Sequence, residues 1–401
     1  MSGPAEDGAA GLSPAERAWA ARVREVARTA IAPHVRDMDT AAALDDKVVR
    51  TLSEEGLLGI EVSAAYGGAG GGLMETVLAI EEIARVDPAV AVLVDVQNAL
   101  LVSAVAGHGS GDQKRRYLPR LASGTVGAYA ISEEQAGSDA FALATHAEPS
   151  DGGYELSGRK YWITNAAEAG LFLVFARTGG TEANPSLTAF MVERDAPGVT
   201  VGERIAKMGI RASSTCEVLL DRVTVGRPDV LGAVGGGNQL MVDTLNIGKA
   251  GIGAQLVGLA QGALDLGIHY AQERRQFGER IGDFQGVRFP LAALAAEIAA
   301  ARALLYDTVR LLAGGAGSPE ECLRAAAMAK YIASEVAERT ASHVVETLGG
   351  NGFATAFLAE KFYRDAKIGK IYEGTSNMQF RTIAATLFTG GPSRATAEGA
   401  P

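Results

Sequence analysis

The spacing of hydrophobic positions divides this chain into three stretches. Up to about residue 124, apolar residues recur at the spacing of amphipathic helices. From about Val126 to Gly232 the pattern changes to alternation between apolar and polar positions, which is typical of short strands. The helical spacing returns from Asn238 onward. This order predicts a mostly α protein with a central β domain.

Local signals give this outline its boundaries. Ser13 to Glu16 and Ser318 to Glu321 have the spacing of a capping box with proline at the first helical position. We expect the first helix to end just before Pro33 and the second to end at Gly349-Gly350. A small antiparallel sheet or barrel is expected from strands at 154–158, 171–176, 187–192, 199–205 and 217–225, with a hairpin turn at 151–153.

The last third of the chain has the pattern of a four-helix-type bundle. Its two apolar stripes are Ile252, Leu256, Leu259, Ala263 and Leu266, and Leu291, Leu294, Ile298, Ala301 and Leu305. The predicted domains are a disordered lead at 1–12, an N-terminal helical domain at 13–125, a middle β domain at 126–232, a C-terminal helical bundle at 233–390 and a flexible tail at 391–401. The apolar stretch from Ala89 to Gly107 is interrupted by polar residues, which favours a buried helix over a membrane span.

Composition narrows the classes of function. Of the 401 residues, 47% are hydrophobic and 21% are charged, which is typical of a globular protein with a large core. The formal charge of −10 argues against a nucleic-acid surface. Cys216 and Cys322 are too few for a disulfide framework and lie in no zinc-binding cluster, so we expect no metal. With no secretory signal at the start of the sequence, we expect a cytoplasmic location.

Glu373 is the strongest candidate for catalysis. It lies between Tyr372 and Gly374, so its carboxylate can occupy an apolar pocket in which desolvation raises its pKa and makes it a usable base. The ordinary alternative is a solvated glutamate on a helix surface.

Two further segments could bind a cofactor. Residues 130–139 include Ser132, Gly137 and Ser138, whose neighbourhood could hold a pyrophosphate through backbone N–H groups, although such residues also form ordinary turns. Trp162 and Thr164 offer a flat ring and a hydroxyl at the end of a strand. The alternative for Trp162 is a tryptophan buried in the core.

Taken in order along the chain, these segments resemble the acyl-CoA dehydrogenase family from about Ser13 to Gly390. The resemblance implies that the enzyme binds FAD. In the β domain and after the base, the positions that match flavin-binding residues of the family are Tyr129, Ile131, Ser132, Gly137, Ser138, Trp162, Ile163, Thr164, Thr375 and Asn377. Thr164 would bond the flavin ring near N5.

The resemblance extends to a cofactor site shared between subunits. Arg274, Phe277 and Gln285 match a family segment that reaches the FAD of a neighbouring subunit, where Arg274 would neutralise the pyrophosphate. Without the resemblance, Arg274 would be interpreted as a solvated arginine. The turn at Glu346, Gly349 and Gly350 is similar to the one that lies against the adenosine half of FAD. Such sharing implies an oligomer, in this family usually a homotetramer.

The implied reaction is α,β-dehydrogenation of an acyl thioester. Glu373 would remove the α-proton while flavin N5 takes the β-hydride, and the thioester oxygen would bond the flavin ribityl and the backbone N–H of Glu373. Substrate-binding positions are Ser138, Asn246, Lys249 and Gly374. The electrons would pass to an electron-transfer flavoprotein. Within the family the chain is most similar to short/branched-chain members, which act on 2-methylbutanoyl and isobutanoyl thioesters.

The sequence departs from the family pattern at three places. Glu134-Gln135 replace the usual Pro-Gly, Lys249 stands where the family has arginine, and Ala356 replaces an acidic or amide residue. The first two leave open an acyl-carrier-protein thioester as substrate, because lysine and arginine are not interchangeable at bidentate sites.

Other readings remain open on the same fold. One is a flavin oxidase or monooxygenase. Another is a flavin-binding, DNA-protecting relative, which would require a basic surface and no base, against the acidic charge and Glu373. Asp95 could lie near the acyl pocket and select a polar tail, or it could be solvated or paired.

Overall fold

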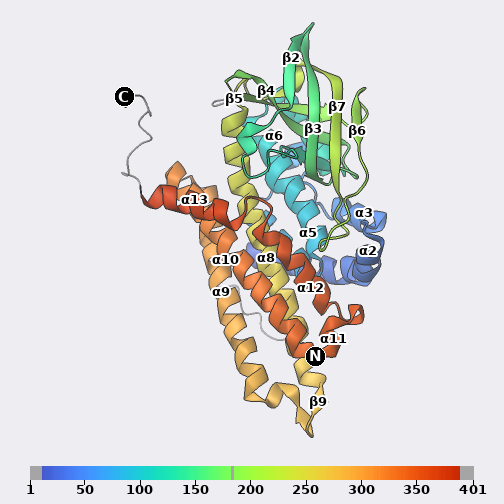
Figure 1. The fold of residues 1–401 in the computed structure, drawn as a ribbon, viewed down its shortest axis with the longest axis vertical. Coiled ribbons are helices and arrows are strands. Elements are labelled where there is room, and N and C mark those ends of the chain that lie inside the picture. The colour runs from blue at the N-terminus through green and yellow to red at the C-terminus, as the bar shows by residue number, and fades with distance from the viewer. Residues whose placement is uncertain (1–10, 182–184, 316, 389–401) are drawn as a thin grey trace, which may run out of the picture.

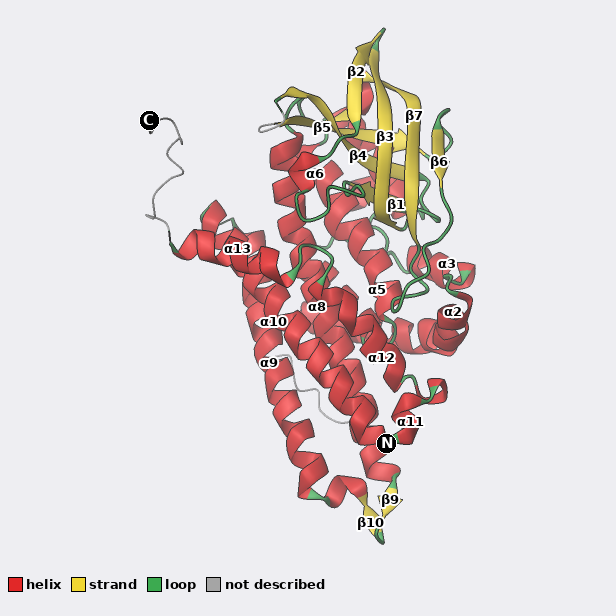
Figure 2. Cartoon of the chain, in the orientation of Figure 1, coloured by secondary structure: helices red, strands yellow, loops and turns green. Residues whose placement is uncertain are grey.

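The computed structural model describes residues 11–181, 185–315 and 317–388. The strands of the large sheet gather at one end of the molecule, and long helices run side by side away from them to the other end (Figures 1 and 2). The order of elements along the chain confirms the predicted fold class, with a helical domain before the β domain and a helical bundle after it. The predicted tail at 391–401 and most of the predicted lead at 1–12 lie outside the described residues.

The N-terminal part is helical as predicted. Its α-helices are α1 (Pro14–Val26), α2 (Val35–Ala41), α3 (Asp46–Glu54), α4 (Leu73–Ala84), α5 (Pro88–Asp95), α6 (Ser103–His108) and α7 (Gly111–Ala122). The capping box at Ser13 is present, with Ser13 and Glu16 bonded to each other's backbone. The expected end before Pro33 was wrong. A π-helical turn and a 3-10 turn carry the chain past Pro33 into α2, because proline is tolerated in the first turn of a helix.

The apolar stretch that begins at Pro88 forms a core helix. Helices α5 and α6 and the π-helical turn Val96–Val102 between them make one continuous element, Pro88–His108. It is long and apolar enough to cross a membrane, but 89% of its most apolar window is buried inside the protein, which confirms the prediction of a buried helix. Helix α9 (Gln285–Gly314) passes the same test of length and composition with 39% of its window buried, and that test alone is weak evidence for a membrane span.

The β domain is an eight-stranded sheet with the strand order β6-β7-β3-β2-β4-β5-β8, and β1 pairs with β4 beside this path. The strands are β1 (Gly127–Ala130), β2 (His146–Ser150), β3 (Gly153–Thr164), β4 (Leu171–Gly180), β5 (Pro185–Glu193), β6 (Val199–Val201), β7 (Thr215–Gly226) and β8 (Val230–Leu231). The predicted hairpin joins β2 to β3. The sheet is not purely antiparallel, because β1 and β2 each run parallel to β4. Such pairs join distant segments, which local alternation cannot reveal.

The C-terminal part is a bundle built on α8 (Gly237–Glu273), α9 and α10 (Pro319–Leu348), which pack on one another. A small hairpin, β9 (Arg275–Gln276) and β10 (Glu279–Arg280), joins α8 to α9 at the far tip (Figure 2). The shorter helices are α11 (Gly350–Phe353), α12 (Ala359–Ala366) and α13 (Ser376–Leu387). The capping box at Ser318 and the end of α10 before Gly349 are both confirmed.

Helix α8 joins the two helical parts of the molecule, because it also packs on α4 and α5 of the N-terminal part. Glycine makes the close approach to α4 possible. A Cβ atom at Gly258 would lie 2.2 Å from the carbonyl oxygen of Glu81, so no larger residue fits without moving a helix. Helix α8 packs on the core with its predicted apolar stripe, since four of the stripe residues are buried: Ile252, Leu256, Leu259 and Ala263.

Candidate active site

A cavity of about 610 Å³ lies where the sheet, α5, α8 and the segment before α13 meet. Its walls include most of the predicted β-domain cofactor residues together with the predicted base. Those residues are Tyr129, Ile131, Ser132, Gly137, Ser138, Trp162, Ile163, Thr164, Glu373, Gly374 and Thr375. The fold therefore brings segments from β1, β3 and the C-terminal bundle to one site.

Trp162 forms an exposed wall of this cavity. A register shift between Lys160 and Ile163 interrupts the pairing of β3 with β7, and Trp162 has a φ of 62° in that irregular stretch. The left-handed backbone leaves the indole 54% exposed, with its ring edge-on to Tyr161 at 5.1 Å between centroids. The alternative of a tryptophan buried in the core was therefore wrong. A non-glycine residue in this conformation is uncommon and is often found at binding sites.

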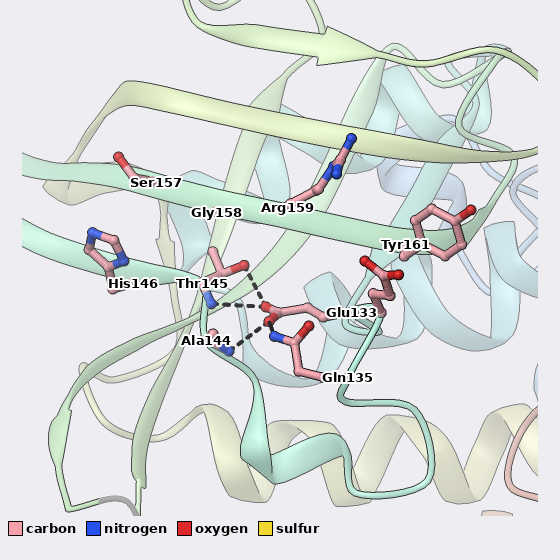
Figure 3. A pocket seen from close by; sticks show the side chains of 10 residues that line it. Glu133, Gln135, Ala144, Thr145, His146, Ser157, Gly158, Arg159 and Tyr161 are labelled. Atoms are coloured by element: carbon pink, nitrogen blue, oxygen red, sulfur yellow. Dashed lines mark hydrogen bonds between the residues drawn. The ribbon is translucent and has the colours of Figure 1, made fainter.

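The loop that carries Ser132, Gly137 and Ser138 is fastened by Glu133, a residue that sequence reasoning did not single out (Figure 3). The Glu133 carboxylate accepts hydrogen bonds from Ala144 N at 2.6 Å and from Thr145 N and Oγ1 at 2.9 and 2.5 Å. It also pairs with Lys160 Nζ at 2.9 Å, and the two side chains are only 2% and 0% exposed. Burial alone would raise the pKa of Glu133, but Lys160 and the hydrogen bonds outweigh it and lower that pKa. The pair therefore holds the loop against the sheet.

No local signal marks Glu133. Its partners Thr145, directly before β2, and Lys160, in β3, lie 12 and 27 residues further along the chain, so only the folded sheet brings them together. Glu133, Glu134 and Gln135 also line a smaller cavity of about 270 Å³ on the outer side of the loop, together with His146 and Arg159 (Figure 3). The departure at Glu134-Gln135 therefore lies on the surface of this loop.

Glu373 has the position expected of a base. It follows a 3-10 turn, Lys367–Lys370, and has a φ of 51°, while Gly374 after it has a φ of 86°. Thr375 then caps α13. Glu373 Oε2 is out of contact with solvent and has no hydrogen-bond partner in the part of the chain that the structure describes. Burial raises the pKa of Glu373, and the ammonium groups of Lys249 and Lys330 oppose that rise.

Two lysines thus supply positive charge to the base. Lys249, on α8, donates to Asn246 Oδ1 at 3.1 Å, and Lys330, on α10, donates to the carbonyl oxygen of Gly374 at 2.7 Å. Neither forms an ion pair at contact distance with Glu373 among the described residues. The sequence had pointed to Lys249 but not to Lys330, which lies in an alanine-rich part of α10 without a motif.

Asp95 is neither solvated nor paired, so both ordinary alternatives for this residue were wrong. It lies at the end of α5, lines the cavity, is 1% exposed, and neither carboxyl oxygen has a hydrogen-bond partner among the described residues. Burial, and then the charge of Glu373, raise the pKa of Asp95 well above its usual range. Burial therefore favours the protonated, uncharged form of Asp95 beside the base.

The remaining predicted residues lie outside this cavity. Arg274, Phe277 and Gln285 lie around the hairpin at the far tip of the bundle, and Phe277 is 94% exposed. The turn at Glu346, Gly349 and Gly350 lies at the same end of the bundle, where Asn351 Nδ2 donates to the Tyr270 hydroxyl at 2.9 Å. Asn377 is exposed at the start of α13. In the described part of the chain, no group of three or more His, Cys, Asp or Glu is placed to hold a metal ion.

The fold and the site define a class of protein before any comparison. An exposed indole and hydroxyl groups from the β domain line the same cavity as Glu373, whose buried Oε2 atom has no hydrogen-bond partner among the described residues, which suits an oxidoreductase that binds a flat redox cofactor beside a general base. Models of the acyl-CoA dehydrogenase family match residues 13–125 (N-terminal domain), 128–223 (middle domain) and 235–388 (C-terminal domain). The chain belongs to the acyl-CoA dehydrogenase family, and it is an FAD-dependent enzyme.

Individual relatives agree with this assignment. The chain is 46% identical over 377 residues to a probable short/branched chain specific acyl-CoA dehydrogenase of Dictyostelium discoideum, covering 94% of this chain and 90% of that one. It matches the structure of butyryl-CoA dehydrogenase from Megasphaera elsdenii with a TM-score of 0.90, 33% identity, and coverage of 94% of this chain and 98% of that one. An acyl-CoA dehydrogenase from Bacillus anthracis complexed with FAD matches with a TM-score of 0.86, 30% identity, and coverage of 94% and 67%.

The cavity fits an isoalloxazine ring. The Trp162 ring is exposed toward it, Ser132, Ser138 and Thr164 line it with hydroxyl groups, and a Cβ atom at Gly137 would meet no heavy atom within 4 Å. The indole and the hydroxyl groups suit the face and polar edge of the ring, and the open backbone at Gly137 suits the anionic pyrophosphate of FAD.

Proposed function

We propose that this enzyme removes the α-proton of a short or 2-methyl-branched acyl-CoA with Glu373, forming the trans-2-enoyl-CoA. The observation that carries the proposal is the buried Oε2 of Glu373, which has no hydrogen-bond partner among the described residues and lies in the wall of the cavity that Trp162 and Thr164 also line. Desolvation makes such a carboxylate a stronger base than one in water. When bound, FAD supplies the acceptor for the β-hydride.

The turn at Glu373 suits binding of the thioester as well as proton removal. No acceptor bonds the backbone N–H of Glu373 within the described residues, so this donor is open to the thioester oxygen. A hydrogen bond to that oxygen stabilises the enolate as the proton leaves, which a free carboxylate could not achieve alone. The positive φ of Glu373 is the kind of backbone strain that functional sites retain.

The acyl chain has an apolar place to bind. Val92, Val96, Leu100 and Ile252 line the cavity from α5, the turn after it and α8. The short or branched acyl class is supported by the similarity to the short/branched chain specific relative. Ser138, Gly374, Asn246 and Lys249 are the proposed contacts for the rest of the acyl-CoA, and the relatives do not favour the carrier-protein or oxidase alternatives.

We also propose a homotetramer that completes the cofactor site. Arg274, Phe277 and Gln285 belong to the tip of the bundle, far from the strands that line the cavity (Figure 2), so within one chain they have no access to the flavin. A neighbouring subunit would bring them to its FAD, and an electron-transfer flavoprotein in the cytoplasm would accept the electrons.

Arg274→Ala tests the sharing of the cofactor site. Loss of a guanidinium from the FAD pyrophosphate should release flavin during gel filtration, seen as a lower ratio of absorbance at 450 to 280 nm. Arg222→Ala, at an exposed position of the sheet, is the control that should keep its flavin. Flavin content unchanged by Arg274→Ala would contradict the shared site.

The proposed function is tested by an anaerobic titration of the holoenzyme. Butanoyl-, isobutanoyl-, 2-methylbutanoyl- and octanoyl-CoA are added in turn, and bleaching of the flavin absorbance is followed. Rapid bleaching by one of the three short or branched thioesters is the expected result. Bleaching by octanoyl-CoA alone would contradict the acyl class, and no bleaching by any of them would contradict the proposed reaction.

A further inference from the structure

Lys330 is a fully buried lysine that bonds the backbone next to the proposed base. It is 0% exposed, on a face of α10 otherwise built from small residues such as Ala326, Ala329 and Ala333. Burying an ammonium group costs free energy unless its surroundings compensate. The other two fully or nearly fully buried lysines among the described residues, Lys160 and Lys361, both form ion pairs at contact distance. Lys330 has no such pair there, and its hydrogen bond goes to a backbone carbonyl instead.

That carbonyl belongs to the residue after the base. Lys330 Nζ donates to Gly374 O at 2.7 Å, so the ammonium holds the two-residue turn in which Glu373 and Gly374 both have positive φ. The amide of Gln379 adds bonds to Glu373 O at 3.0 Å and Gly374 O at 2.8 Å. A glutamate in the left-handed region is strained, unlike the glycine after it, and needs such anchors to persist.

The second effect of Lys330 is electrostatic. The charged and titratable groups that face Glu373 are Lys249 from α8, Lys330 from α10, Asp95 from α5, Tyr129 from β1 and the neighbouring Tyr372. Burial raises the pKa values of Asp95 and both tyrosines, which favours their uncharged forms. The two lysines are therefore the cations that offset the negative charge of the base.

We propose that Lys330 is a positioning residue for Glu373, holding the turn through the Gly374 carbonyl while its charge keeps the buried carboxylate ionised for removal of the α-proton. This inference rests on the proposed function. The two lysines differ in how they are held, because Lys249 bonds a side chain of its own helix and Lys330 bonds the loop of the base itself. Burial lowers the pKa of Lys330 to about 8 against the opposing effect of Glu373, so the ammonium remains charged at neutral pH.

The test is the pH dependence of the flavin-reduction rate constant in holoenzyme variants. Removing the positive charge in Lys330→Met raises the pKa of the base, so the acid limb of the profile should move to higher pH by about one unit. Lys330→Gln, which keeps a hydrogen-bond donor but no charge, should show the same shift. Lys330→Arg, which keeps the charge, should restore the limb to its wild-type position.

Lys370→Gln is the matched control. Lys370 lies in the same C-terminal segment but pairs with Glu335 and Glu338 on the outside of α10, so its loss should leave the acid limb in place. An acid limb unmoved in both Lys330→Met and Lys330→Gln, with the rate lowered equally at every pH, would overturn the electrostatic role. Glu373→Gln separates the two proposals: if it reduced flavin at the wild-type rate, the proposed function itself would fail, whatever the Lys330 variants did.

Discussion

Glu133 and Glu373 are two glutamates with carboxylate oxygens shielded from solvent, each in the wall of a different cavity and each near a buried lysine. Glu133 accepts hydrogen bonds from Ala144 and Thr145 and forms an ion pair with Lys160. The Oε2 atom of Glu373 accepts none within the described residues. The pKa of Glu133 is lowered by its partners, whereas burial raises that of Glu373.

The difference lies in how the partners are arranged, since Glu133 and the Oε2 atom of Glu373 are both shielded from solvent. A carboxylate with all its acceptor sites used is a stable anion that fixes a loop, and it has little tendency to take a proton. A carboxylate with an unused oxygen in a cavity gains from accepting a proton. Glu133 therefore has a structural role in fixing the loop, and Glu373 is the carboxylate suited to accept a proton.

The largest effect should come from Glu373→Gln. The amide has nearly the same shape but cannot take the α-proton, so flavin reduction by acyl-CoA should slow by about 10³-fold. Stopped-flow absorbance under anaerobic conditions measures this rate. Glu335→Gln, at a partly exposed glutamate of α10, is the control and should reduce flavin at the wild-type rate. A Glu373→Gln enzyme of normal speed would remove the distinction between the two glutamates.

Glu133→Gln should affect stability more than chemistry. It leaves the buried ammonium of Lys160 without a counter-ion, which costs about 3 kcal/mol of unfolding free energy. Equilibrium urea unfolding measures the loss. The double variant Glu133→Gln/Lys160→Met removes both charges and should recover part of it, as expected for coupled partners. Additive losses in the double variant would show that the ion pair does not fasten the loop.

The ion pair between Glu133 and Lys160 also makes the free energy of unfolding depend on pH, in a direction that follows from the lowered pKa of Glu133. Because the pKa of Glu133 is lower in the folded protein than the usual glutamate value of 4.5, its contribution to stability is present above that value. It is lost as the pH falls through the folded pKa. Glu133→Gln should therefore have a lower free energy of unfolding than the wild type at pH 7. The two proteins should differ little in acid, where Glu133 of the wild type is already protonated.

Asp95 is another carboxyl shielded from solvent beside the base. The effect expected from substituting it is the smallest. Its raised pKa means that the folded protein holds a proton there that the unfolded chain releases above pH 4, so this residue lowers stability as pH rises. Asp95→Asn copies the neutral acid and removes that penalty. Thermal unfolding should show a gain of about 1 kcal/mol at pH 8 and less at pH 5. An equal effect at both pH values would contradict a neutral Asp95.

The sequence predicted what local patterns determine. The capping boxes at Ser13 and Ser318, the buried faces of α8 and α9 and the placement of Glu373 before a glycine all rest on residues a few positions apart. The parallel pairing of β1 with β4, and the bonds from Lys160 to Glu133 and from Lys330 to Gly374, span 27 to 44 residues. No spacing rule reveals such contacts, because packing of the whole sheet and bundle produces them.

Trp162 shows the same limit at a single residue. An aromatic residue within a strand fits a core position as well as a binding wall, and only the register shift in β3 turns this ring outward. At Pro33 the local signal itself misled. The proline predicted a helix end, but a π-helical turn and a 3-10 turn carry the chain past it.

The most direct test of the account is hydrogen exchange at the acyl α-carbon. Wild-type holoenzyme and Glu373→Gln holoenzyme are incubated anaerobically in D₂O with the acyl-CoA that bleaches the flavin, and deuterium at the α-carbon is measured by mass spectrometry. If Glu373 is the base, we expect the wild type to incorporate deuterium and Glu373→Gln to do so at least about 10²-fold more slowly. Exchange at the wild-type rate in Glu373→Gln would contradict the assignment of Glu373 as the base.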